Sequence, residues 1–225
     1  QHNMAASNAN RQLGISTNTL SKSTEKLSSG YRINRAADDA AGLSISEKMR
    51  SQIRGLNKAS SNAQDGISAI QTAEGALNEA HSILQRMNEL ATQSANDTNT
   101  TADRTAVQSE VNALTNELSR IASTSQFNTQ NLLDGTFTGK NLQVGALENQ
   151  KITISIGTMN AKALGVDSLD VKSFTKAGSA MTLIQKAISK VSGQRSDLGA
   201  LQNRLEHTVN NLDNISENTQ TAESR

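Results

Sequence analysis

Residues 56–95 read LNKASSNAQDGISAIQTAEGALNEAHSILQRMNELATQSA. Apolar and small residues recur there in steps of three or four with no proline between them, which predicts a helix with one apolar stripe rather than a strand. Such a helix is about 60 Å long, more than the diameter of a compact small domain. Because the stripe is narrow and rich in alanine, it suits a coiled-coil seam and requires partner helices of similar length. The stripe consists of Leu56, Ala59, Ala63, Ile67, Ile70, Ala73, Leu77, Ala80, Leu84, Met87 and Ala91.

A second long pattern, near the end of the chain, supplies such a partner. Between residues 180 and 222, stripe positions that include Leu212 and Ile215 alternate in steps of four and three, so we expect a helix that matches the first in length. A shorter helix follows the polar loop 96–101, with Thr101 or Asp103 as its cap, and folds back antiparallel on the first. Its stripe consists of Val107, Val111, Leu114, Leu118 and Ile121.

The remaining helical segments are weaker. Residues 6–27 carry a heptad pattern with polar interruptions, which ends before Gly30, a residue suited to a left-handed helix cap. Residues 31–43 mix arginine, aspartate and glycine, which is typical of a folded connection. A short helix over residues 44–54 is then expected to lead into the long one.

Between the long helices the pattern changes. Residues 127–137 show no helical period, so we expect an irregular packed loop, and residues 157–178 support no assignment. Leu142–Val144 and Ile152–Ile156 alternate apolar with polar residues, which predicts a β-hairpin. The predicted fold class is mainly α: an elongated antiparallel helical bundle of coiled-coil-like rods with a small β-hairpin. Its predicted parts are 1–43 (first helix and connector), 44–135 (long helix, shorter helix and loop), 136–179 (hairpin and connection) and 180–225 (last long helix).

The composition argues against several classes of function. The net charge is +1 on 225 residues, with both signs scattered, so no basic stripe offers itself to nucleic acid and no polybasic run to a membrane. No apolar run is long enough to span a bilayer. Aromatic residues make up 2% of the chain, which disfavours a thick globular core, and the absence of cysteine excludes disulfides and thiolate metal sites.

The sequence contains no recognisable catalytic constellation, so we expect neither an enzyme nor a cofactor. Serines and threonines are plentiful, but none sits in a nucleophile elbow. The pair Asp38-Asp39 is close to Arg32 and Arg35, and ion pairing within the connector explains it better than a cation site. The histidines stand alone, so each is interpreted as a surface or interface residue and no metal site is expected. They are His2, His81 and His207.

Several segments resemble one family. Residues 27–45, LSSGYRINRAADDAAGLSI, are similar to the amino-terminal signature of bacterial flagellin. The resemblance covers residues 1–135 and 180–225. The other matching segments, in order, are SQIRGL (51–56), QDGIS (64–68), QTAEGAL (71–77), NLLDG (131–135) and LQNRLEH (201–207).

The resemblance implies a structural subunit of the bacterial flagellar filament, which assembles with copies of itself into a hollow tube for swimming motility. It also implies a secreted protein that passes through the flagellum's own export channel, with an export chaperone and the filament cap as partners. Two departures are expected. Flagellins continue beyond Arg225 with a helix that lines the inner tube, so this chain resembles a fragment, and the short stretch between Asp134 and Ala180 leaves no room for large outer domains.

The resemblance also implies a binding site. In flagellins, a segment similar to residues 84–90 is recognised by the flagellin-sensing Toll-like receptor of vertebrates. Arg86 and Leu90 would be the central contacts, and their spacing gives a charged fork beside an apolar anchor. From the residues alone a solvated helix face is the better interpretation, and only the resemblance favours the receptor. The receptor-binding residues so implied are Gln85, Arg86, Glu89, Leu90 and Glu110.

Two alternatives to the filament subunit remain open. The nearer one is the junction protein between hook and filament, which shares the helical plan but caps instead of propagating. The more distant one is a monomeric secreted helical adaptor. Growth of copies onto filament seeds separates both from a filament subunit.

Overall fold

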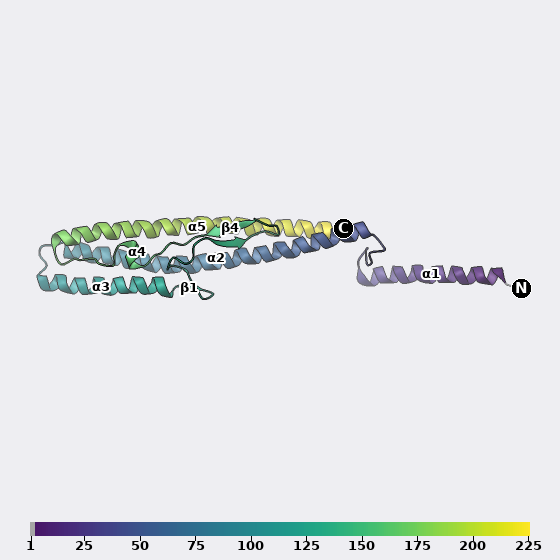
Figure 1. Ribbon diagram of the computed structural model, residues 1–225, viewed down its shortest axis with the longest axis horizontal. Helices are drawn as coiled ribbons and strands as arrows, with labels where there is room; N and C mark the ends of the chain where they lie inside the picture. The colour runs from purple at the N-terminus through teal and green to yellow at the C-terminus, as the bar shows by residue number, and fades with distance from the viewer. Residues whose placement is uncertain (1–2) are drawn as a thin grey trace. The chain divides into compact units, whose positions relative to one another are not determined.

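The computed structural model describes residues 3–225 and is mainly α-helical, as predicted, with two small antiparallel hairpins where one was expected (Figure 1). Contacts divide the chain into two compact units: Gly55–Ser216, and the chain up to Arg54 together with Glu217–Arg225. The four-part division drawn from the sequence stays a prediction. The elements are α1 (Met4–Ser29), α2 (Ala40–Ser94), α3 (Thr101–Thr124), β1 (Gln126–Phe127), β2 (Gln130–Asn131), β3 (Lys140–Gln143), β4 (Lys151–Ile154), α4 (Ala161–Leu164) and α5 (Phe174–Ser224).

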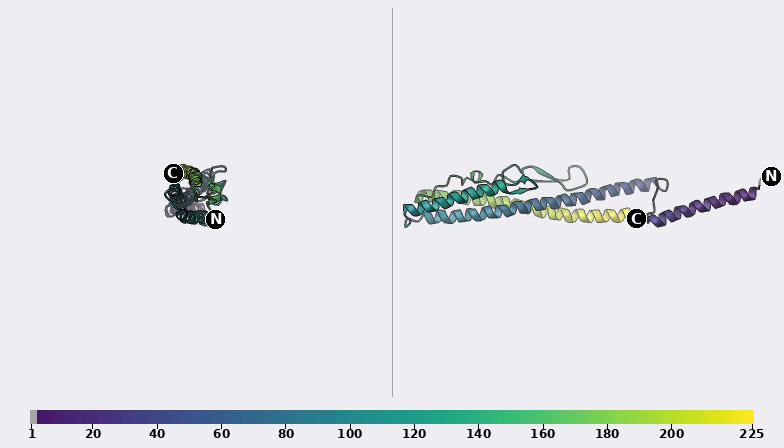
Figure 2. Two further views of the ribbon diagram at one scale, coloured as in Figure 1. Left: turned by 90° about the vertical axis from the view of Figure 1, so that its left-hand side faces the viewer. Right: turned by 90° about the horizontal axis from the view of Figure 1, so that it is seen from below.

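The unit Gly55–Ser216 is organised around α2 and α5, which lie side by side and antiparallel (Figures 1 and 2). Near one end of the pair, the Thr92 hydroxyl donates to Met181 Sδ at 3.3 Å. The two predicted stripes face one another across a seam that is rich in alanine. The seam residues that are at most 2% exposed include Ala63, Ile70, Ala73, Leu77, Leu84 and Ala91 on α2, and Ala180, Ile184, Ala187, Val191, Leu198 and Leu205 on α5.

The far end of this seam combines a small apolar cluster, which is Leu56, Ala59 and Leu212, with polar contacts. The Ser60 hydroxyl donates to Asp213 Oδ1 at 3.1 Å, and the Ser216 hydroxyl donates to Asn57 Oδ1 at 2.8 Å. Ser216 is 9% exposed and takes an inward position, whereas Ile215, which the spacing had placed on the stripe, is 42% exposed. The apolar pattern therefore ends earlier than predicted, and side-chain hydrogen bonds continue the contact.

The start of α2 differs from the prediction. The sequence suggested a connection over residues 31–43 and a separate short helix over 44–54, but one unbroken helix begins at Ala40. Gly42 donates its backbone N–H to Asp39 Oδ1 at 2.9 Å, which satisfies one of the free donors of the first turn. This side-chain cap fixes the start of the helix at Ala40, four residues before the expected short helix.

Helix α3 packs beside α2, as Figure 1 shows. Its cap is Thr100 rather than the predicted Thr101 or Asp103. The Thr100 hydroxyl accepts from the Asp103 N–H at 3.2 Å, and Asp103 Oδ2 accepts from the Thr100 N–H at 2.9 Å. This reciprocal capping box fixes the point at which the chain turns back.

The segment expected to be an irregular loop begins with a hairpin. β1 and β2 pair antiparallel across a turn in which Asn128 has φ 46° and Thr129 has φ 63°. Two successive residues in the left-handed region match the twist of a tight hairpin, but glycine is the usual choice at such a position. Behind the turn, Leu132 and Leu133 are buried in the core.

The second hairpin confirms the prediction. β3 pairs antiparallel with β4, and Leu142 lies opposite Ile152. Leu142 Cδ1 occupies the space that a Cβ would take on Gly66 of α2, so the missing side chain lets the hairpin settle against the helix.

In the other unit, α1 ends at Gly30, whose φ of 72° makes it the predicted left-handed cap. No residue of α1 is buried within this unit. The Glu223 carboxylate accepts from the Ser46 hydroxyl at 2.8 Å and from Arg50 Nε at 2.9 Å. The Arg50 guanidinium also lies 5.3 Å from the centre of the Tyr31 ring.

Replacing Thr129 with glycine is expected to stabilise the protein. A β-branched residue at φ 63° is strained, and glycine adopts this conformation freely. We expect the free energy of unfolding in urea to rise by about 1 kcal/mol. Ser168→Gly, at an exposed position outside the left-handed region, is the control and should lower it by about 0.5 kcal/mol. A lower urea midpoint for Thr129→Gly would contradict the strain.

Candidate functional site

The centre of the predicted site is the Arg86 guanidinium on α2. Its Nε and Nη2 donate to Glu110 Oε1 on α3 at 3.0 and 2.9 Å, and its Nη1 donates to Glu89 Oε2 at 3.1 Å. Its hydrogen bonds to Glu110, and to a smaller extent the one to Glu89, raise the pKa of Arg86 above its ordinary value. The structure thus brings together three of the five predicted residues in one ion-pair network.

This network lies at the surface. The side chains of Arg86, Glu89 and Glu110 are 50%, 67% and 46% exposed. Ion pairs this exposed add little to stability, because water screens the charges. Their structural effect is to hold the guanidinium in one direction between two helices, with part of it facing solvent.

Gln85 extends this surface along α2. It is exposed, and its Nε2 lies 3.1 Å from His81 Nε2, one helical turn away. The contact ties the Gln85 amide to an imidazole that is itself half-buried. Of the other predicted surface histidines, His207 is exposed, and His2 lies outside the described residues.

Leu90 does not lie on this surface. Its side chain is 1% exposed and belongs to the same core cluster as Val107 and Val111 of α3. This corrects the expectation of an apolar anchor beside Arg86. Leu90 lies four residues after Arg86, and that step rotates it toward the α3 side of the seam. Leu90 therefore packs beneath the ion-pair network, in the core shared by α2 and α3.

The connector pairs its charges differently from the prediction. Arg35 Nε bonds Glu25 Oε1 at 2.9 Å instead of pairing with Asp38 or Asp39. Asp38 Oδ2 accepts from the backbone N–H groups of Arg35 and Asn34, and these bonds lower the pKa of Asp38. Both aspartates therefore stabilise backbone turns. Within residues 3–225, no group of three or more acidic or histidine side chains is arranged to hold a metal ion.

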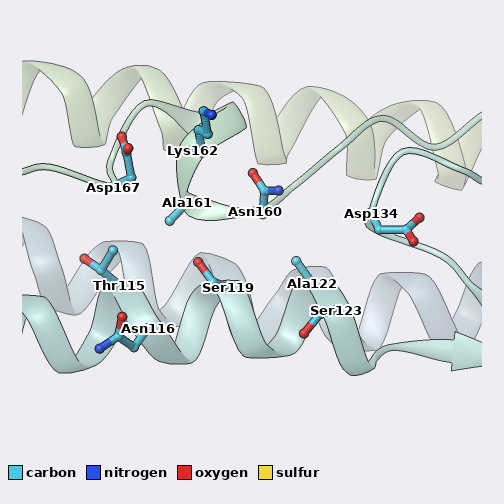
Figure 3. Close-up of a pocket in the computed structure, with 10 residues that line it drawn as sticks. All are labelled: Thr115, Asn116, Ser119, Ala122, Ser123, Asp134, Asn160, Ala161, Lys162 and Asp167. Atoms are coloured by element: carbon cyan, nitrogen blue, oxygen red, sulfur yellow. The ribbon is translucent and has the colours of Figure 1, made fainter.

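A cavity of about 290 Å³ lies between α3 and α4 (Figure 3). The Asp134 carboxylate at its edge accepts from the Thr136 hydroxyl at 2.6 Å and the Thr136 N–H at 2.9 Å, and these bonds lower the pKa of Asp134. Asn131 Nδ2 also donates to it at 3.0 Å. The carboxylate is thus engaged in closing its own turn. The polar lining includes Asn116, Ser119, Asn160, Lys162 and Asp167.

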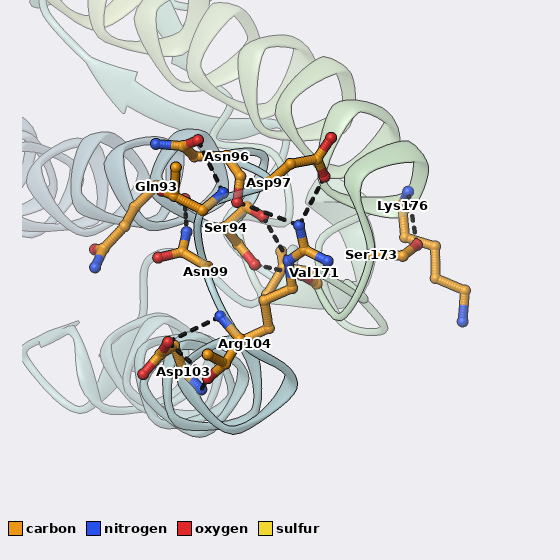
Figure 4. A network of polar contacts seen from close by, with 12 residues as sticks. Gln93, Ser94, Asn96, Asp97, Asn99, Asp103, Arg104, Val171, Ser173 and Lys176 are labelled. Carbon is orange, nitrogen blue, oxygen red and sulfur yellow. Dashed lines mark hydrogen bonds and ion pairs between the residues drawn. The ribbon is translucent and has the colours of Figure 1, made fainter.

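Arg104 is a structural residue that the sequence analysis did not single out. Its Nε donates to the Ser94 carbonyl at 3.1 Å, and its Nη2 donates to the Asn96 carbonyl at 3.2 Å and pairs with Asp97 at 3.1 Å (Figure 4). The guanidinium thereby satisfies carbonyl groups where α2 ends. The positive charge of Arg104 is also favoured here, because the C-terminal end of a helix carries the negative pole of the helix dipole.

Gln108 is a second structural residue that the sequence pattern did not single out. Its Nε2 donates to the Leu169 carbonyl at 2.8 Å, and its Oε1 accepts from the Val171 N–H at 2.7 Å. The Ser94 hydroxyl donates to the Val171 carbonyl, so this irregular segment is fixed to both α2 and α3 (Figure 4). The only sequence signal was a glutamine next to Val107, on the apolar side of a predicted helix.

Long antiparallel helices joined through narrow seams define the class of this chain: a helical structural protein of the coiled-coil type. The family model of the bacterial flagellin N-terminal helical region matches residues 1–138. The family model of the bacterial flagellin C-terminal helical region matches residues 181–225. The chain belongs to the bacterial flagellin family. It is a structural subunit of the flagellar filament, an extracellular assembly formed by copies of the subunit.

Individual relatives agree with this assignment. A flagellin from Halalkalibacterium halodurans is 56% identical over 226 residues, which cover 100% of this chain and 83% of that protein. The crystal structure of Bacillus cereus flagellin has 32% sequence identity and a TM-score of 0.59, covering 68% of this chain and 88% of that one. A putative flagellar hook-associated protein from Vibrio parahaemolyticus shares the fold, with a TM-score of 0.69 at 12% identity, over 84% of this chain and 99% of that one.

Replacing Gln108 with leucine is expected to destabilise the protein by about 3 kcal/mol, because the Leu169 carbonyl and the Val171 N–H lose their buried partner. Urea unfolding measures the loss, and hydrogen exchange should report faster exchange of the Val171 amide. Gln185→Leu, on the exposed face of α5, serves as the control and should stay within about 0.5 kcal/mol of wild type. Unchanged Val171 exchange would rule out the role assigned to Gln108.

Proposed function

We propose that this flagellin, beyond its structural role, is a ligand of the flagellin-sensing Toll-like receptor of vertebrates. The proposed contact surface consists of Gln85, Arg86, Glu89 and Glu110. The observation that supports it is the half-exposed Arg86 guanidinium, held by carboxylates from two helices. A side chain that is fixed before binding loses little conformational entropy when a partner closes over it. Arginine in a fixed orientation is also typical of interface hot spots.

Leu90 has an indirect role in this proposal. Because its side chain is 1% exposed, a partner that docks on α2 does not reach it. We infer that Leu90 keeps α2 packed on α3, so that Arg86 stays within reach of Glu110. The proposed receptor-binding surface of this chain is therefore polar, and the buried Leu90 lies beneath it.

The family assignment also supports proposals about export and partners. We propose that the chain is secreted through the flagellar export channel, escorted by an export chaperone, and added to the filament beneath its cap. Flagellins are structural proteins, and we infer that this one is not an enzyme. None of the helices in residues 3–225 has an apolar stretch long enough to cross a membrane.

The two alternatives are less well supported. The hook–filament junction protein finds support in a likeness of fold at 12% identity, whereas the flagellin relative is 56% identical across the whole chain. A monomeric adaptor finds no support in the family assignment. We therefore retain the filament subunit as the function, with receptor binding as the proposal to be tested.

The decisive test is the affinity of Arg86→Ala for the purified receptor ectodomain. Removing the guanidinium should weaken binding by about 2 kcal/mol, roughly 30-fold in Kd, as is typical of a hot-spot arginine. Surface plasmon resonance measures the change. Circular dichroism of the variant should match wild type, because exposed ion pairs add little to the stability of the helices.

Arg120→Ala is the matched control. Arg120 is also an exposed arginine in an ion pair, with Glu117 one turn away on α3, but it lies outside the proposed surface. Its removal should leave the receptor affinity unchanged. Wild-type affinity of Arg86→Ala, or an equal loss in both variants, would sink the proposal.

A further inference from the structure

The turn between β3 and β4, residues 144–150, is held rigidly by its own side chains; we call it the tip loop. Gln143 Nε2 donates to the carbonyls of Gly145 and Leu147 at 2.9 and 2.7 Å. Gln150 Oε1 accepts from the Leu147 N–H at 3.0 Å, and the Gln150 side chain packs directly over Gly145. Two glutamines thus satisfy the backbone of the loop and fix its shape.

This rigid loop exposes an apolar side chain. Leu147 is 62% exposed, and Glu148 next to it is exposed as well. The neighbouring Ala146 packs on Gly55 of α2, so the loop is anchored while Leu147 points away. A leucine held in place before contact gains burial without the entropy cost of ordering a flexible loop, which is the property of a docking residue.

A cavity of about 240 Å³ lies elsewhere in the same unit, between α2, the β1–β2 turn and β3; we call it the phenylalanine pocket. It contains two of the three phenylalanines of the chain, Phe127 and Phe137. Leu142, Ile154 and Ala69 complete its apolar wall. Aromatic and aliphatic walls of this kind accept an aliphatic side chain.

The mouth of the phenylalanine pocket carries the strained turn. Asn128 lines the pocket, and Thr129 follows it, both in the left-handed region. At Gly30, Gly135, Gly139 and Gly165 the chain uses glycine for this conformation. Among residues 3–225, non-glycine residues occupy this region only at Asn128 and Thr129 and, in the tip loop, at Asn149; asparagine adopts it readily, so Thr129 alone is strained. Strain at Thr129, next to the pocket-lining Asn128, points to a role of this turn beyond folding.

The tip loop and the phenylalanine pocket cannot meet within one chain. Ala146 contacts α2 at Gly55, whereas the pocket contacts α2 at Asp65, Gly66 and Ala69. These positions are at least ten residues apart along one helix, about 15 Å. The contact of Ala146 with Gly55 also keeps the tip loop at its own end of the hairpin. A contact between loop and pocket therefore joins two copies.

The charges around the two features are complementary. The tip loop carries Glu148 and is followed by Lys151, while the pocket rim carries Lys140 and Asp65. None of these four has an ion-pair partner among the nine ion pairs found in residues 3–225. Lys140 only approaches the Phe137 ring, at 5.7 Å. Unpaired charges of opposite sign fix the orientation of an association.

We propose that the tip loop of one copy docks into the phenylalanine pocket of a second copy, with Leu147 seated between the two rings. Glu148 then faces Lys140, and Lys151 faces Asp65. The contact joins two different surfaces, so each copy keeps a free loop and a free pocket. A heterologous contact whose rotation does not close into a ring propagates into an open helical array, which is the symmetry of a filament.

Disulfide trapping tests the contact, because the chain has no cysteine of its own. Leu147→Cys is mixed with a mass-tagged Asn128→Cys chain, added to sonicated flagellin filaments and mildly oxidised. The cross-linked heterodimer should be about tenfold more abundant than with a tagged Leu183→Cys chain as control, because docking raises the effective concentration of the pair. Leu183 is an exposed leucine on α5. A yield no higher than the control, or no heterodimer, overturns the docking.

A charge reversal tests the orientation. Glu148→Lys on the Leu147→Cys chain should lower the heterodimer yield about tenfold, because it faces Lys140 of the other copy. Lys140→Glu on the Asn128→Cys chain should restore it. Asp167→Lys on the Leu147→Cys chain, an exposed acid away from the tip loop, should change nothing. Loss of yield without recovery in the paired reversal overturns the proposed orientation.

Discussion

Close packing of α2 against α5 brings two distant parts of the chain together, and every other element of the unit Gly55–Ser216 is placed against that pair. Alanines on both stripes allow the approach, and leucines and isoleucines between them supply buried area. With aromatic residues at only 2% of the chain, no bulky core is available to replace this seam. Helix α3, the hairpins and the segment around α4 each cover a flank of it.

The sequence predicted those parts of the fold that follow a period. Stripes in steps of three and four located α2, α3 and α5, and alternation located β3 and β4. Where a single hydrogen bond decides the local structure, periodicity carries no information. Asp39 caps α2 and allows it to start at Ala40, and Thr100 rather than Thr101 caps α3. Likewise, Ser216 turns inward because Asn57 lies opposite, which leaves Ile215 outside.

The candidate site was predictable in part. Spacing placed Arg86 and Glu89 on one helix face, and the structure adds Glu110 from α3, as the family resemblance implied. Burial was not predictable, because Leu90 belongs to the seam and not to the exposed face. Gln108 and Arg104 escaped notice for the same reason: their partners are backbone groups of remote segments, and side-chain patterns say nothing of these.

The polar end of the seam has a mechanical consequence. An apolar coiled-coil seam looks much the same after a slip of one heptad, so longitudinal shear can move one helix along the other at low cost. Here a slip of seven residues would separate Asp213 from Ser60 and turn it toward Ile67, and would part Ser216 from Asn57. These side-chain hydrogen bonds between α2 and α5 thus oppose sliding of one helix along the other. A thread that transmits torque along its length depends on subunits whose helices do not creep under load.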